Sequence, residues 1–178
     1  MPRVIIRSEP RSPEFDRLVQ CLAQELKNPS PGPQPLIVEQ EVSATRSRHV
    51  QVIWDQWKKL PDEQRTDAIL EAYKQAEGAD YADQITIMNA LTGAEALTLG
   101  LLPWKVEPNQ GKSGGPSEED YGRALQKEEK QTVLGAGSIK KYGALRYARK
   151  EDAEEAIRRL KALLPKSAWT LSQDIYSD

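Results

Sequence analysis

Residues 36–54 read LIVEQEVSATRSRHVQVIW, and their alternation decides the fold that we expect for the first half of the chain. Glutamates and other polar residues stand between apolar ones in this stretch. The apolar positions that recur at every second residue include Leu36, Val38, Val50, Val52 and Trp54. Because a period of two is typical of strands with one buried face, the stretch predicts a β-hairpin.

The same residues predict how the two strands pair. Pairing Val42 with Val50 and Val38 with Trp54 puts both apolar sets on one face and leaves residues 45–47 as the loop. A shift by one residue would bury the glutamates instead. We therefore expect this register.

Amphipathic helices flank the hairpin. Ser12-Pro13 is a helix start, and apolar residues follow it at three- and four-residue spacing up to about Lys27. After the hairpin, Asp62 and Glu63 place acid in a first helical turn, and Gly78 ends the helix. The hairpin is thus expected between two helices that can cover it.

The stretch from residue 81 to residue 99 allows two interpretations. Ile85-Thr86-Ile87-Met88 reads as a strand, and Thr92 with Glu95 has the spacing of a capping box that begins a short helix. The alternative is one continuous helix over 81–99. The β-branched residues and Gly93 favour the strand followed by the helix.

With a further short strand at residues 4–6, the first part runs strand, helix, strand, strand, helix, strand. That is the βαββαβ order of a ferredoxin-like, or split βαβ, unit. The sequence therefore predicts an α+β protein with a ferredoxin-like N-terminal unit. Residues 101–107 are expected to add an edge strand to that unit or to pack beneath it.

A Gly/Pro-rich run, PNQGKSGGP at residues 108–116, reads as a flexible linker. The residues after it predict a polar helix of about fifteen residues from Ser117, a strand near 142–148, a helix at 150–164 and a strand at 168–171. We expect three parts: a ferredoxin-like unit at 1–108, a linker at 109–116 and a small αβαβ unit at 117–178. Since so small a unit buries little surface alone, it should pack on the first unit or associate with another copy.

Composition excludes several classes of protein. The 178 residues hold 25 Lys+Arg against 27 Asp+Glu, and the formal net charge of −2 describes neither a polyanion nor a basic nucleic-acid coat. No apolar run is long enough to span a membrane or to form a signal peptide. Cys21 is the single cysteine, so we expect no internal disulfide and a reducing, cytoplasmic location.

Basic and aromatic residues gather without any acid in residues 139–150. Side chains of these two kinds can hold a phosphate backbone and stack on bases. The candidate ligand- or nucleic-acid-binding residues are Lys140, Lys141, Tyr142, Arg146, Tyr147, Arg149 and Lys150. The alternative is an exposed strand whose charges balance the acids of the next helix.

Within this stretch, residues 140–147 resemble part of the third-strand motif of RNA-recognition domains. Tyr142, Gly143, Leu145 and Tyr147 fit that motif, whereas Lys141 and Ala144 depart from it. The resemblance spans eight residues, and no first half of such a domain precedes it. It implies RNA as the nucleic acid if the stretch binds one.

Two further sets of residues are candidates for contacts. Arg46, Arg48 and His49 form a basic cluster at the hairpin tip, which can also be a solvated loop. Trp57 and Trp104 are candidate anchors for a protein partner, with a role in the core as the alternative. Cys21, at the edge of an apolar helical stripe, is expected to be a buried thiol.

No catalytic residue, metal ligand or cofactor emerges from the sequence. His49 is the single histidine, and the acid pairs fall in first helical turns or on outer helix faces. We therefore expect a cytoplasmic, non-enzymatic binding or assembly protein that contacts a protein partner or itself, and no membrane. Binding of RNA or of another anionic ligand through 139–150 is the alternative, and an enzyme with an unrecognised site is a second one.

Overall fold

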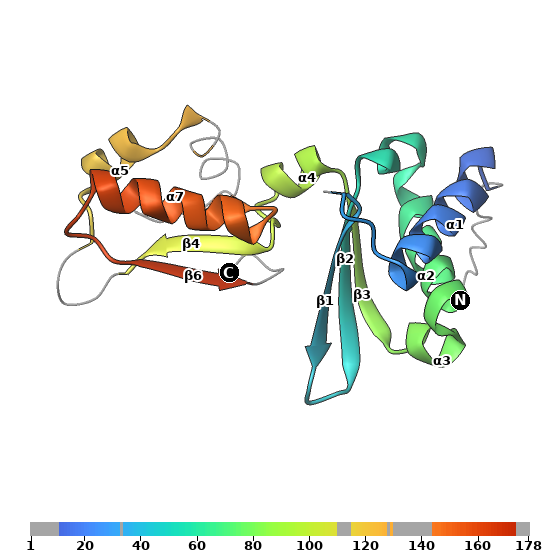
Figure 1. The fold of residues 1–178 in the computed structure, drawn as a ribbon. Helices are drawn as coiled ribbons and strands as arrows, with labels where there is room; N and C mark the ends of the chain where they lie inside the picture. Colours follow the sequence, from blue (N-terminus) through green and yellow to red (C-terminus); the bar gives the residue numbers. More distant parts are fainter. Residues whose placement is uncertain (1–10, 33, 110–114, 128, 130–143, 174–178) are drawn as a thin grey trace, which may run out of the picture. The chain divides into compact units, whose positions relative to one another are not determined.

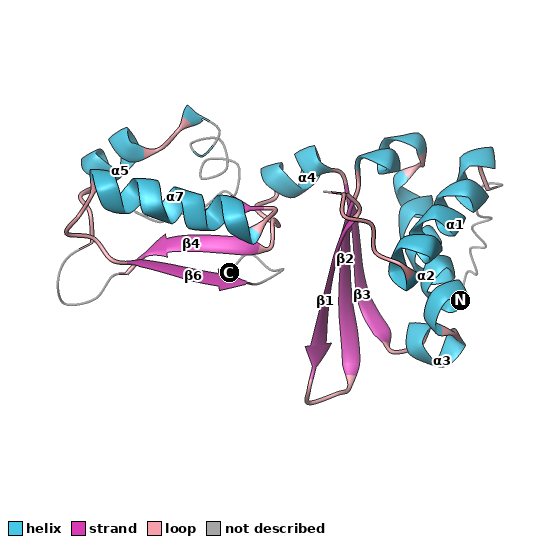
Figure 2. Cartoon of the chain, viewed as in Figure 1, coloured by secondary structure: helices cyan, strands magenta, loops and turns pink. Residues whose placement is uncertain are grey.

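The computed structural model describes residues 11–32, 34–109, 115–127, 129 and 144–173. Helices and strands are mixed throughout these residues, so the α+β class is confirmed (Figure 2). The chain divides into two compact units, Met1–Thr92 and Gly93–Asp178.

The first unit contains a three-stranded sheet and helices on one side of it (Figure 1). Its elements are α1 (Pro13–Lys27), β1 (Leu36–Val42), β2 (Ser47–Ile53), the 3-10 helix η1 (Asp55–Lys59), α2 (Asp62–Glu77), α3 (Ala79–Ala82) and β3 (Ile85–Leu91). Both long helices lie where the sequence predicts them. Their boundaries follow from Pro13 in the first turn of α1 and from Gly78 at the end of α2.

Gly78 adopts φ 97° and ψ 166°, a backbone conformation open essentially to glycine alone. It lets the chain leave α2 and enter α3 without an intervening loop. This is the physical reason for the end of the helix at this residue.

The strand-then-helix interpretation of residues 81–99 is confirmed. β3 covers Ile85–Leu91, and α4 (Gly93–Thr98) follows it. The β-branched residues thus outweigh the helical spacing of Ile85, Met88 and Leu91.

The ferredoxin-like order is wrong in one pairing. In a split βαβ unit, another strand lies between the two strands that a crossover helix connects. Here β2 and β3, connected through α2, pair directly and parallel, and the sheet order is β1-β2-β3. The strand expected at residues 4–6 lies outside the described residues.

The hairpin forms, but its register differs from the prediction. Val42 pairs with Ser47 and Val38 with Gln51, and the turn consists of the four residues 43–46. In this register Val38 and Val42 lie on one face of the sheet, whereas Val50 and Val52 lie on the other. The two apolar sets that the sequence analysis placed together are therefore on opposite faces.

The core of the first unit lies between the sheet and the helices. It joins the apolar stripe of α1 to that of α2 and to the helix-facing side of β2, where Val50 and Val52 are buried. Cys21, expected to be buried, is exposed on α1.

The second unit also has a three-stranded sheet, in the order β5-β4-β6. After α4, its elements are β4 (Trp104–Pro108), α5 (Glu118–Ala124), β5 (Leu145–Tyr147), α7 (Lys150–Leu163) and β6 (Trp169–Gln173). The helix predicted from Ser117 ends earlier than expected, because α5 stops at Ala124 and Leu125 is extended.

The boundary between the units differs from the predicted one. Strand β4 precedes the Gly/Pro-rich run, yet it is the central strand of the second sheet and pairs antiparallel with both β5 and β6. Residues 109–116 therefore connect two parts of one unit and do not separate two units. Their central residues, 110–114, lie outside the description.

The core of the second unit lies between this sheet and its helices. Val106, Leu145 and Trp169 project from the three strands toward Leu160 of α7 and Tyr121 of α5. The two cores share no residue.

Candidate functional site

The described members of the basic stretch are engaged in contacts within the second unit. Arg146 is buried and donates to the carbonyl oxygen of Leu102 (3.3 Å). Exposed Arg149 donates two hydrogen bonds to the carboxylate of Asp152, at 2.6 and 2.9 Å. These hydrogen bonds and the negative charge of Asp152 raise the pKa of the Arg149 guanidinium above its usual value.

Lys150 lies 3.4 Å from Glu154 of α7 and 5.9 Å from the centroid of the Trp104 ring. Trp104, a candidate anchor for a partner, is half-buried on β4 and lies beside the Lys150 ammonium group. Lys140, Lys141 and Tyr142 lie outside the described residues.

Tyr147 belongs to a polar cluster that the sequence analysis did not find. Its hydroxyl donates to Glu129 (2.6 Å), whose carboxylate also accepts from the guanidinium of Arg159 and from the backbone N–H of Gln126 (2.7 Å). Glu129 is only 7% exposed. The cluster therefore ties β5 and α7 to the segment after α5.

Electrostatics keep Tyr147 as a hydrogen-bond donor. Burial, and then the hydrogen bond to Glu129 and its negative charge, raise the pKa of Tyr147 well above its usual value. A general acid or base works best with a pKa near the operating pH. The cluster borders a hollow of about 250 Å³ that Asp152 and Glu155 also line. The hydrogen bonds of the cluster connect separate elements of the second unit, so its role is structural.

At the hairpin tip, the three basic residues point to different places. Arg46 is exposed at φ 55°, beside a hollow of about 400 Å³ that Asp83 and Gln84 also line. Arg48 faces the helix side of the sheet, whereas His49 pairs with Gln40 on the opposite face. The structure does not bring them together into one patch.

Arg48 takes part in a second cluster around Glu39. The hydroxyls of Tyr73 and Tyr81 donate to the two oxygens of this carboxylate, each at 2.6 Å. The two rings stack nearly parallel with centroids 5.9 Å apart, and the Arg48 guanidinium lies 4.5 Å from the Tyr81 centroid. Glu39 therefore projects toward the helices, where the sequence analysis expected solvent.

The pKa values of both tyrosines are shifted upward. Burial is the main cause for each, followed by the hydrogen bond to Glu39 and its charge. These effects raise the pKa of Tyr81 to about 12, although Arg48 acts in the opposite direction. Both hydroxyls thus remain donors at neutral pH.

Trp57 cannot anchor a partner in the folded protein. Its side chain is 0% exposed, and its indole N–H donates to the carbonyl oxygen of Val52 (3.1 Å). Trp57 therefore belongs to the core, which was the alternative prediction for this residue. The reason is η1, which turns the chain back over the end of the sheet.

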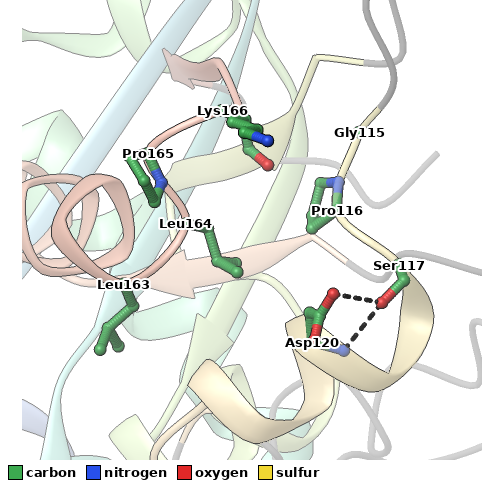
Figure 3. A pocket seen from close by; sticks show the side chains of 9 residues that line it. Gly115, Pro116, Ser117, Asp120, Leu163, Leu164, Pro165 and Lys166 are labelled. Atoms are coloured by element: carbon green, nitrogen blue, oxygen red, sulfur yellow. Dashed lines mark hydrogen bonds between the residues drawn. The ribbon is translucent and has the colours of Figure 1, made fainter.

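A hollow of about 560 Å³ lies between the start of α5 and the end of α7 (Figure 3). Pro116, Ser117 and Asp120 line one side, and residues 163–167 line the other. Ser117 caps α5 by accepting from the N–H of Asp120 (3.1 Å), so these polar groups already have partners. The hollow is wide and open, and Lys166 is the cation at its rim.

The face of the first sheet opposite the helices carries three rows of side chains that cross all three strands. Strand register places Leu36, Ile53 and Leu91 in one row. The next row is Val38, Gln51 and Asn89, and the third is Gln40, His49 and Ile87. Ile87 is 41% exposed, although it is a large apolar residue. Apolar and amide side chains therefore dominate this face, and its accessible part lies along the outer strands, because Gln51 and Ile53 of β2 are only 0% and 3% exposed.

The two outer strands of this sheet differ in chemistry. β1 carries Glu39 and Glu41, whereas β3 reads ITIMNAL and holds neither a charged residue nor a proline. Within the described residues, β3 pairs with β2 alone, and no described strand lies on its other side. Sequence periodicity predicts β3 as a strand but does not show its place in a sheet.

Comparison with known proteins adds no information about function: no protein-family model matches the chain, and neither a curated protein nor a solved structure matches it. In the described part of the chain, His, Cys, Asp and Glu form no group of three or more that could hold a metal ion. No described helix is both long and apolar enough to cross a membrane.

Proposed function

We propose that the protein is a non-enzymatic binding or assembly protein and that β3, with the sheet face beside it, is its contact surface. The observation that carries the proposal is the uncharged edge of β3. Natural sheets usually protect an edge with charged residues, proline, bulges or very short strands. β3 has seven residues and a single irregularity near its start, so it keeps a regular uncharged stretch over residues 87–91.

The sheet face beside this edge supports the same proposal. Ile87 and Leu91 lie on it, and the described helices of the first unit pack on the opposite face. A strand added to β3 would gain backbone hydrogen bonds and cover the exposed Ile87 side chain. This is the mode of recognition called β-strand addition.

Nucleic-acid binding through residues 139–150 has weaker support. Arg146, Arg149 and Lys150 already contact groups of the second unit, and Tyr147 contacts Glu129. A phosphate would have to compete with these partners. We also propose the cytoplasm as its location, on the ground that a lone, exposed Cys21 suits a reducing compartment.

The experiment is site-specific photocross-linking in cells. A photoreactive amino acid at position 87 should give a discrete cross-linked product, because the proposed partner strand lies within reach of that side chain. The same amino acid at Gln20, exposed on α1 of the same unit, is the matched control and should give none. Equal products from both positions, or none from position 87, would contradict the proposal.

A further inference from the structure

We infer that the partner of β3 is β3 of a second copy of this chain, paired antiparallel about Asn89 so that two sheets join across a two-fold axis. This inference rests on the proposed function and names the occupant of that surface. A two-fold interface uses the same patch on both subunits, so the patch must complement itself. β3 must therefore complement another β3 in its backbone groups, its side chains and its charge.

Backbone groups give the first part of that complementarity. The N–H of Trp54, just after β2, donates to the carbonyl of Leu91 (2.8 Å). In a parallel ladder this fixes which residues of β3 turn toward β2, namely Leu91, Asn89 and Ile87 in alternation. Met88 and Ala90 consequently turn their N–H and C=O groups outward. Antiparallel pairing about Asn89 sets Met88 opposite Ala90 of the second copy, which lets both pairs exchange hydrogen bonds.

Side chains give the second part. On the face away from the helices, pairing about Asn89 sets exposed Ile87 against Leu91 of the second copy. It also sets the Asn89 amide against the same amide, which has both a donor and an acceptor. Apolar and hydrogen-bonding cross-strand pairs of these kinds stabilise a sheet.

Charge favours a second copy at this edge and disfavours one at the other edge. Since β3 has no charged residue, it meets no like charge when it pairs with itself. Self-pairing of β1 would instead bring together strands that each carry Glu41, whose side chain is 59% exposed. Like charges on facing strands are destabilising, so β3 is the edge suited to self-association.

A charge exchange at position 89 tests the inference on the full chain. Light scattering after size-exclusion chromatography should give a dimer for the wild type. Asn89→Lys and Asn89→Glu should each weaken the dimer about tenfold or more, because like charges then face each other across the axis. An equimolar mixture of the two variants should restore it, since opposite charges then pair. Far-UV circular dichroism checks that each variant is folded.

A disulfide tests the register. Residues opposite each other in a non-hydrogen-bonded pair have Cα atoms about 4.5 Å apart, within the range that a disulfide spans. In a Cys21→Ser background, Asn89→Cys should form an intermolecular disulfide under mild oxidation. Gln40→Cys, on the same face but on β1, is the matched control and should remain reduced.

Each result has a definite meaning. A wild-type chain that stays monomeric at all concentrations, or variants whose mixture is not a dimer, would overturn the inference. A cross-link from position 87 to a different protein would also overturn it while leaving the proposed function in place. A cross-linked product of twice the mass of the chain supports both.

Discussion

Two glutamates have similar roles in the two units: Glu39 accepts hydrogen bonds from two tyrosine hydroxyls and Glu129 from one, and each lies beside an arginine. Glu39 accepts hydrogen bonds from Tyr73 and Tyr81, and Glu129 accepts them from Tyr147 and Arg159. A hydrogen bond to a charged acceptor is stronger than one between neutral groups. These clusters therefore connect residues that are far apart in the sequence.

Replacing Glu129 should be costly. Glu129→Ala leaves the Tyr147 hydroxyl without its acceptor and the Arg159 guanidinium with only the carbonyl oxygen of Ala124, so we expect the free energy of unfolding to fall by about 2–3 kcal/mol. Glu119→Ala is the matched control, because Glu119 and Arg123 form an ion pair whose side chains are 75% and 71% exposed. It should change stability by less than about 0.5 kcal/mol. Urea unfolding measures both, and equal losses would show that burial of Glu129 adds nothing.

Tyr81 should make stability depend on alkaline pH. The folded state raises its pKa from 10.0 to about 12. The folded protein therefore holds this proton over a pH range in which the unfolded chain releases it, and the stability from Tyr81 is complete below pH 10 and is lost as pH rises toward about 12. Tyr81→Phe should destabilise the protein at pH 9, and this difference from the wild type should shrink by pH 11. Denaturant unfolding at the two pH values measures it; a constant difference would contradict the cluster geometry.

At the scale of elements, Gly78 separates α2 from α3 by its backbone conformation alone. A Cβ atom there would meet no heavy atom within 4 Å, so any penalty for a side chain comes from the backbone. Gly78→Ala should lower the free energy of unfolding by about 1–3 kcal/mol.

The control for Gly78 is the same substitution inside a helix. Gly122 lies in α5, and a Cβ atom there also meets nothing within 4 Å. Gly122→Ala should raise stability by about 0.5–1 kcal/mol, because alanine loses less conformational freedom in a helix. Thermal unfolding of the two variants should therefore move in opposite directions, and shifts of the same sign would contradict this account.

Local patterns predicted most elements but not their partners. The apolar stripe of α1, the end of α2 and the strand at Ile85–Leu91 follow from spacing and from residue preferences that act within a few residues. The register of the hairpin depends on the turn: Arg46 at φ 55° lengthens the loop to four residues and moves Val42 opposite Ser47. Nothing in residues 101–107 shows that β4 pairs with a strand more than sixty residues later.

For the candidate sites too, local patterns predicted the residues but not their partners. Arg46, Arg48 and Tyr147 were singled out for charge or aromaticity, but the roles of the last two depend on Glu39 and Glu129. Those contacts cross from one element to another, so no spacing rule connects them. Trp57 was ambiguous because the 3-10 helix that buries it leaves no periodic signal.

At the scale of the whole molecule, the two separate cores predict separate stabilities. Leu22 and Leu160 are both fully buried, one in each core. Leu22→Ala should cost about 2–5 kcal/mol and should reduce amide protection in α1, α2 and β1–β3 only. Leu160→Ala should do the same for α7 and β4–β6. Hydrogen exchange followed by mass spectrometry distinguishes the two, and loss of protection in both units from either substitution would contradict the division.

The indole rings of Trp54 and Trp57 give the first unit an optical signature. Their centroids are 5.2 Å apart and their planes are inclined by 81°, which is close enough for the electronic transitions of the two rings to couple. Coupled, inclined chromophores in a fixed chiral arrangement produce a paired positive and negative band in circular dichroism. Because η1 holds this geometry where the chain turns from β2 toward α2, the band pair reports on that turn, and Trp57→Phe should abolish it.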